Sequence, residues 1–193
     1  SRSKVLIMSS TTSLDHSLPN RVPKVTFDFW IIKLLAVTMG ETAADYLAVN
    51  LGLGLTATSA IMAAVLAFAL FLQFRQRRYV PWTYWTAVVL ISIVGTLVTD
   101  NLVDNLGVTL VTCTVVFTAA LAATFALWYS SEGTLSIHKV FTTRRESFYW
   151  LAILLTFALG TAVGDLIAEK FGIGYFHTGI LFAMIIASLT FGY

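Results

Sequence analysis

The chain repeats one acidic pattern three times inside segments that are otherwise apolar. In each copy an aspartate follows a glycine by five residues and a tryptophan by fifteen, and these aspartates are Asp45, Asp100 and Asp165. Tryptophan is rare and an aspartate within an apolar segment is rarer, so chance is a poor explanation for the fixed spacing. Internal repetition is the sequence signature of folds that use one structural unit several times. It is therefore the first constraint on this fold.

The composition places these repeats in a membrane. Of the 193 residues, 58% are hydrophobic and 11% are charged, whereas soluble domains carry roughly 25% charged residues. Apolar segments of about 16 to 23 residues are near the length that crosses roughly 30 Å of hydrocarbon. There are six of them, at residues 27–49, 53–74, 82–102, 108–128, 149–167 and 178–193. The sequence predicts an all-α polytopic membrane protein with the lipid bilayer around it.

Each repeat is predicted to be a helical hairpin, with an acid-bearing first helix and a plain second helix. Short turns that contain glycine join the two helices, at residues 50–54, 105–107 and 171–174. The longer connections and the segment before the first span are rich in arginine and lysine, so the positive-inside rule places them in the cytoplasm. All hairpins then have one orientation, which is a parallel repeat. We expect an inner set of acid-bearing helices and an outer set of plain ones.

The predicted organisation is a tail followed by one membrane domain. Residues 1–23 contain basic residues but no apolar run long enough for a signal peptide, and we expect a mobile cytoplasmic tail there. The membrane domain is predicted to cover residues 24–193. Its hairpins are residues 24–78, 79–130 and 145–193, with a cytoplasmic loop at 131–144.

Six carboxylates in the acid-bearing spans form pairs with i, i+4 spacing, so the two members of a pair share one helix face. The pairs are Glu41 with Asp45, Asp100 with Asp104, and Asp165 with Glu169. Positions +1, +5 and +9 from the repeat glycine drift only about 40° per step, so they form one stripe on each helix. The four deepest carboxylates would together cost on the order of 10 kcal/mol if they faced lipid. They must face each other, water or a cation.

A shared polar cavity that opens outward meets this requirement in two ways. The acids hold a cation there, or some of them are protonated because they are buried among like charges; a proton-coupled cation carrier would use both. The leading hypothesis is a small cation transporter, such as a divalent-metal exporter coupled to protons. Its metal ligands or proton carriers would be Glu41, Asp45, Asp100 and Asp165. A second set, Asp104, Glu169, His177 and Asn101, would form the outer vestibule or the cation pathway.

The ligand types limit the cation. Carboxylates with hydroxyl and amide support suit hard ions such as Mg²⁺, Ca²⁺ or Mn²⁺, whereas copper and zinc sites favour thiolates or several imidazoles. The single cysteine, Cys113, provides no disulfide framework, CxxC site or haem motif. His177 has two interpretations, as a ligand or proton relay and as an ordinary interfacial residue at a helix start. We expect a divalent cation, with manganese preferred, and no resident cofactor.

Two alternatives to transport remain open, and a third is not favoured. The acids can simply cap helix ends and bond neighbouring helices, as polar residues do in many bundles. The chain can also be a non-catalytic accessory or structural subunit whose acids pair with bases of a larger membrane complex. An intramembrane enzyme is not favoured, because no nucleophile and base stand at recognisable spacing. The expected partners are a small cation and either a second copy of the chain or another membrane protein; a net charge of +2 indicates no nucleic-acid patch.

Two runs of the sequence resemble a known family. KVTFDFWIIKLLAVTMGETAADYL (residues 24–47) and EGTLSIHKVFTTRRESFYW (residues 132–150) are similar to segments of bacterial membrane proteins described only as carrying a repeat of unknown function. The likeness covers most of the chain from Pro23 onward. It implies a multi-pass protein of the bacterial inner membrane, with a cytoplasmic N-terminus, and brings no assigned reaction. Members carry a fourth hairpin, so we expect six spans here, truncated from eight.

Overall fold

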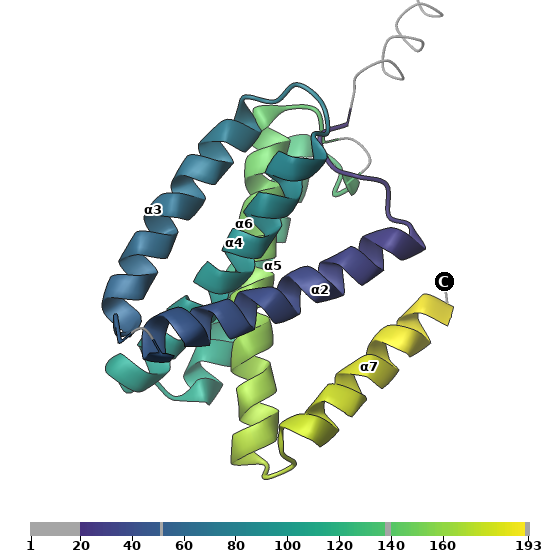
Figure 1. Cartoon of the computed structure of the whole chain (residues 1–193). Coiled ribbons are helices and arrows are strands. Elements are labelled where there is room, and N and C mark those ends of the chain that lie inside the picture. Colours follow the sequence, from purple (N-terminus) through teal and green to yellow (C-terminus); the bar gives the residue numbers. More distant parts are fainter. Residues whose placement is uncertain (1–19, 51, 138–139, 192–193) are drawn as a thin grey trace, which may run out of the picture.

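The computed structural model describes residues 20–50, 52–137 and 140–191, and this part of the chain is all-helical, as the sequence predicts. Its α-helices are α2 (Phe27–Asp45), α3 (Leu55–Phe74), α4 (Pro81–Asp100), α5 (Leu110–Glu132), α6 (Thr143–Asp165) and α7 (Tyr175–Phe191) (Figure 1). The acid-bearing helices α2, α4 and α6 each continue directly into a π-helical turn. These turns are η1 (Tyr46–Asn50), η2 (Asn101–Asn105) and η4 (Leu166–Lys170).

Local signals set the helix ends. Threonine hydroxyls at the starts of α2, α5 and α6 accept a hydrogen bond from a backbone N–H of the first turn, which is the usual N-cap arrangement; the residues are Thr26, Thr109 and Thr142. The turns between an acid-bearing helix and the following plain helix each contain a glycine with φ of 65° to 67°, a left-handed conformation that suits glycine best. These glycines are Gly52, Gly107 and Gly172. We call this end of the bundle the turn end and the opposite end the loop end.

Four of the described helices are long and apolar enough to cross a membrane: α3, α4 with η2, α5, and α6 with η4. The other two differ for identifiable reasons, because α2 carries Asp28 and Lys33 in addition to its acid pair and α7 has 17 residues. The plain helices expose large apolar side chains along their length. Val115 and Leu127 of α5, for example, are 62% and 61% exposed. Apolar surface of this extent is compatible with a multi-pass membrane protein.

Helix α4 lies at the centre of the bundle. Helices α2, α3 and α6 all pack against it, and Tyr84, Val88 and Leu97 of α4 are completely buried as a result. Helix α5 packs against α6. The plain helix of a repeat therefore packs most extensively on the acid-bearing helix of the next repeat. Helix α7 contacts α6 and η4 and otherwise extends away from the other helices (Figure 1).

A buried polar cluster closes the loop end. Glu146, in the first turn of α6, is completely buried and pairs with Arg21, whose Nη1 lies 2.6 Å from Glu146 Oε2. Gln73 of α3 and Trp150 of α6 donate hydrogen bonds to Glu146 Oε1, at 2.9 and 3.3 Å. The segment before α2, the end of α3 and the start of α6 are thereby held together.

The structure differs from the predicted boundaries at this end. Residues 20–22 were placed in the mobile tail, but the Asn20 side chain bonds Ile137 and Val140, and Arg21 is held by Glu146; the rest of the predicted tail lies outside the described residues. Helix α6 begins at Thr143, before the apolar segment that starts at residue 149, because the Thr142 cap extends it through a polar first turn.

Candidate functional site

A cavity of about 640 Å³ lies at the turn end, between α2, α4, α6 and the start of α7. It is lined by the residues at +1, +5 and +9 from the repeat glycines Gly40, Gly95 and Gly160. These nine residues are Glu41, Asp45 and Val49 in the first repeat, Thr96, Asp100 and Asp104 in the second, and Thr161, Asp165 and Glu169 in the third. The same stripe of all three acid-bearing helices thus faces one space.

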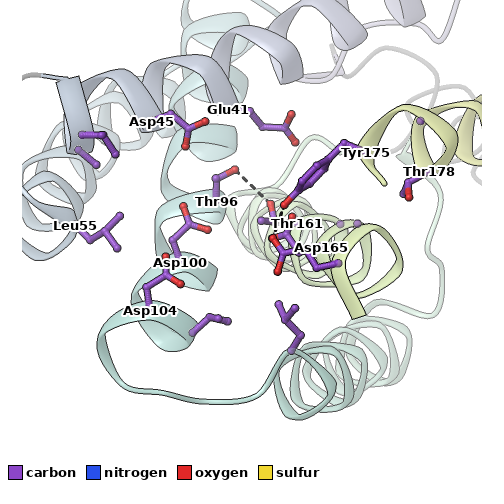
Figure 2. Close-up of a pocket in the computed structure, with 18 of the residues that line it drawn as sticks. Glu41, Asp45, Leu55, Thr96, Asp100, Asp104, Thr161, Asp165, Tyr175 and Thr178 are labelled. Atoms are coloured by element: carbon purple, nitrogen blue, oxygen red, sulfur yellow. Dashed lines mark hydrogen bonds between the residues drawn. The ribbon is translucent and has the colours of Figure 1, made fainter. Parts of the chain in front are cut away.

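The side chains converge on this space from different helices. In Figure 2, Glu41 and Asp45 extend from α2 on one side, Asp100 from α4 on a second side, and Asp165 from α6 on a third. At the floor between α4 and α6 the hydroxyls of Thr96 and Thr161 share a hydrogen bond of 3.3 Å. The two middle aspartates of α4 and α6 are half-buried, whereas the acids of α2 are exposed.

Helix geometry accounts for the convergence. Residues four apart lie on one helix face, so packing any one stripe residue toward a neighbouring acid-bearing helix brings the whole stripe with it. In each repeat the π-helical turn starts immediately after the +5 aspartate and includes the +9 residue. Such turns occur frequently at functional sites. Their presence was not predicted, and the related feature of the sequence is the constant seven-residue spacing from the aspartate to the turn glycine.

The carboxylates of the cavity differ in whether they have a protein partner. Glu169 accepts a hydrogen bond of 2.5 Å from the Tyr175 hydroxyl of α7. Among the described residues, no hydrogen bond or salt bridge engages Glu41, Asp45 or Asp100. A role in capping or in bonding neighbouring helices therefore does not account for these three acids, and their oxygens are available to water or to a solute.

The cavity is lined by acidic side chains. Six of its lining residues are Asp or Glu, and no Lys, Arg or His of the described chain lines it. Lys33 is the basic residue of α2, but it lies roughly 12 Å along the helix from Glu41, and its Nζ is over the Phe157 ring at 5.0 Å. A cleft lined by one sign of charge raises the local concentration of counter-ions. The arrangement therefore attracts cations.

The acids do not form a closed ligand cage. In the part of the chain that the structure describes, no three His, Cys, Asp or Glu side chains are grouped closely enough to hold a metal ion. A dehydrated Mg²⁺ requires near-octahedral oxygens at about 2.0–2.1 Å, and in proteins it usually keeps several waters. Carboxylates that face a roomy cavity from separate helices suit a hydrated cation or protons.

Two residues that the sequence assigned to the vestibule lie elsewhere. His177 is exposed in the first turn of α7, where its ring packs against Phe176 at 5.6 Å, and it does not line the cavity. Asn101 turns toward α3 and donates to the Leu55 carbonyl at 3.2 Å and to the Ser59 hydroxyl. Asp104 and Glu169 do line the cavity. The number of residues from the start of each helix predicted that all four lie near the turn end. The rotation of each helix about its axis decides which of them reach the cavity.

Two further polar residues of the site, Tyr175 and Thr178 of α7, were missed. Tyr175 is the first residue of α7, and the equivalent first residues of α3 and α5, Leu55 and Leu110, also line the cavity. Each stands three residues after the turn glycine of its repeat. The repeat spacing therefore contained a signal for this position, although only the third copy places a hydroxyl there.

A comparison with protein families identifies the repeat. The model described as Repeat of Unknown Function (DUF347) matches residues 29–79, 83–134 and 148–193. The chain belongs to this family. Each match covers one acid-bearing helix and the plain helix that follows it, so the spacing that relates Asp45, Asp100 and Asp165 is the repeat of the family. A search of curated proteins and a search of solved structures gave no match.

Proposed function

We propose that the protein is a membrane transporter for a cation, with the acidic cavity as the place where the cation enters. The observation that supports this function best is the lining itself: equivalent positions of three repeats supply six carboxylates and no basic residue to one space. Anionic side chains within membrane segments are expensive unless they meet water, one another or a cation. A cavity that accepts cations makes their position in apolar helices favourable.

In the proposed arrangement all six described helices cross the bilayer as three hairpins of one orientation. The loop end faces the cytoplasm, because Arg75, Arg77 and Arg78 follow α3 there, and the glycine turns face the opposite side. Helix α2 crosses despite its charges, since its acids face the cavity and the stem of Lys33 extends along apolar surface. By its family resemblance, the membrane is the inner membrane of a bacterium.

The closed loop end is what we expect for a carrier in the conformation that is open at the turn end. The hydrogen bond between the Tyr84 and Tyr149 hydroxyls joins α4 to α6 on the side away from the acids, and the Glu146 cluster joins Arg21 and α3 to α6 at the same end. With this end closed, the proposed access to the cavity is from the turn end. Transport requires these contacts to separate while the turn end closes, which is the rocking of repeats around a central site known from other carriers.

A hard divalent cation is the proposed substrate, with Mn²⁺ as the first to test. Carboxylate and hydroxyl oxygens are the ligands that such ions prefer. The cation is held among Glu41, Asp45, Asp100 and Asp165 with most of its water shell, because no three of these side chains are grouped closely enough to bind the ion directly. When the cation leaves, a carboxylate takes up a proton in its place, so the cation and protons move in opposite directions.

Flux through proteoliposomes tests this function. The purified protein is reconstituted, Mn²⁺, Mg²⁺, Ca²⁺ or H⁺ is added outside, and entry is followed with a fluorescent indicator inside. Asp45→Asn, Asp100→Asn and Asp165→Asn each remove one charged ligand, which costs about 1.5–3 kcal/mol of binding, or roughly tenfold or more in affinity. Asp28→Asn is the matched control, because Asp28 lies in the first turn of α2 and does not line the cavity.

We expect wild type and Asp28→Asn to transport equally and the three cavity variants to lose most of the flux. Equal flux in all five proteins would reject the proposal. So would a wild type that moves none of the four ions; if such a protein copurified with a membrane partner in an acid-dependent way, the accessory-subunit hypothesis would replace it.

A further inference from the structure

The segment immediately before α2 binds the two loops that join α3 to α4 and α5 to α6. In the first of these loops, the Tyr79 N–H donates a hydrogen bond of 3.1 Å to the Asn20 carbonyl. In the second, the Asn20 amide donates to the Ile137 carbonyl at 3.0 Å, and its side-chain oxygen accepts from the Val140 N–H at 3.1 Å. We call residues 20–22 the strap.

The strap links all three repeats. The α3–α4 loop joins the first repeat to the second, and the α5–α6 loop joins the second repeat to the third. The Arg21 backbone N–H donates to the Val140 carbonyl at 3.0 Å, while the Arg21 side chain pairs with Glu146 of α6. Val22 is buried in the same apolar cluster as Val140. A movement that separates the two loops must therefore break contacts of the strap.

Helix α2 connects the strap to the acidic cavity. Residues 24–28, which lead into α2, are exposed, and Figure 1 shows this part of the chain running from the loop end to the start of α2. Helices α4 and α6 share hydrogen bonds between hydroxyls at the loop end and at the cavity floor. Helix α2 is joined to α4 through Ser92, whose hydroxyl donates to the Ala36 carbonyl at 3.3 Å. Because α2 carries Glu41 and Asp45, a shift of α2 relative to α4 and α6 moves both the strap and two of the acids.

We propose that the strap holds the loop end closed and that its release opens the cavity toward the cytoplasm. Its role in transport rests on the function proposed above. A cation among the acids draws α2 toward α4 and α6, and this shift pulls the strap away from the two loops. Asn20 and Arg21 are partly exposed, and hydrogen bonds that water can replace contribute modestly to stability, so the release is reversible. On opening, water reaches Arg21 and Glu146, and neither charge is left buried without a partner.

Thiol labelling from either side of the membrane tests the proposal. Thr161→Cys with Cys113→Ala places one reporter at the floor of the cavity. A charged reagent is added to the turn side or the loop side of proteoliposomes that hold the protein in one orientation. Asn20→Ala removes both side-chain hydrogen bonds of the strap. We expect the ratio of loop-side to turn-side labelling to increase roughly tenfold, because two bonds that stabilise the closed state are lost.

Two further variants make the comparison specific. Gln76→Ala is the matched control, because Gln76 is partly exposed in the α3–α4 loop and bonds the Gln73 carbonyl through its backbone N–H, which alanine keeps. It should leave the labelling ratio at the wild-type value. Val22→Ala reduces the apolar packing of the strap and keeps its hydrogen bonds, so it should increase the ratio as well. It also serves as the strap variant if Asn20→Ala does not fold.

Ratios equal to that of wild type in the strap variants would overturn the proposal. So would an equal increase in Gln76→Ala, because any disturbance of the loop end would then have the same effect. The labelling requires no transported ion. A wild type that moves none of the tested cations, with increased ratios in the strap variants, would reject the proposed transport and support the strap. A wild type that transports Mn²⁺, with unchanged ratios in the strap variants, would support transport and reject the strap.

Discussion

Glu146 shows how strongly single polar residues can determine the closed end of the bundle. It is completely buried, and within the part of the chain that the structure describes its charge is compensated by Arg21. Arg21→Met leaves a buried carboxylate without a cation, so we expect it to lower the free energy of unfolding by about 3 kcal/mol or more. Arg144→Met is the control, because Arg144 is 65% exposed and lies 3.6 Å from Glu132, and an exposed pair contributes about 0–1 kcal/mol. Thermal unfolding in detergent measures the stability of both variants. Similar decreases in Tm for Arg21→Met and Arg144→Met would contradict the importance of the buried pair.

Asn101 and Asp100 are neighbours in sequence with different roles. The Asn101 amide donates to Leu55 and Leu97 backbone carbonyls at 3.2 and 2.9 Å and so ties the start of α3 to α4. Asn101→Leu should therefore cost about 1–3 kcal/mol of stability and leave the flux of the surviving folded protein near that of wild type. Asp100→Asn should instead leave the stability near that of wild type and lower the flux. An Asn101→Leu protein with normal stability and no flux would contradict this structural role and support a role of Asn101 in the cation pathway.

At the scale of helices, the repeat glycines set the distance between neighbouring acid-bearing helices. A methyl group on Gly95 would meet the Phe157 side chain at 2.7 Å and the Ala158 backbone nitrogen at 3.2 Å. Because backbone cannot move aside cheaply, we expect Gly95→Ala to destabilise the protein by about 1–3 kcal/mol. Gly164→Ala, in a position with open space, should be neutral or slightly stabilising, since alanine favours helix. Unfolding curves of the two variants make the comparison; equal stability would contradict the close α4–α6 contact.

The sequence predicted which residues share a helix face, but it did not predict which helices pack against each other. Spacing alone predicted the stripe that contains Asp45, Asp100 and Asp165, because helical geometry fixes which positions share a face. It did not predict that α3 packs on the following acid-bearing helix, since a helix that is apolar all round gives no indication of which side is covered by protein and which by lipid. For the same reason the sequence did not predict that His177 and Asn101 lie outside the cavity lining. Their level along the helix follows from residue count, but the rotation of the helix follows from packing.

At the scale of the whole molecule, a cation that binds the cavity should stabilise the fold. A ligand that binds the native state alone stabilises it by about 2.7 kcal/mol at a hundredfold excess over Kd. We expect Mn²⁺ to raise the Tm of wild type and Asp28→Asn in detergent, and to leave that of the double variant Asp100→Asn, Asp165→Asn unchanged. The double variant lacks two of the carboxylates that line the cavity, whereas Asp28→Asn keeps all six. A Tm increase of equal size in all three would indicate binding elsewhere.

The central claim is that the acids of three separate helices share one water-filled cavity open at the turn end. Thiol accessibility in sealed proteoliposomes tests it most directly. Cysteine replaces Asp45, Asp100 or Asp165 in a Cys113→Ala background, with Val115→Cys on the exposed face of α5 as the lipid-facing control. A charged reagent that cannot cross the bilayer should label all three cavity cysteines from the same side and leave the control unlabelled. Three cysteines that stay unlabelled from both sides, or that react from different sides, would contradict the shared cavity.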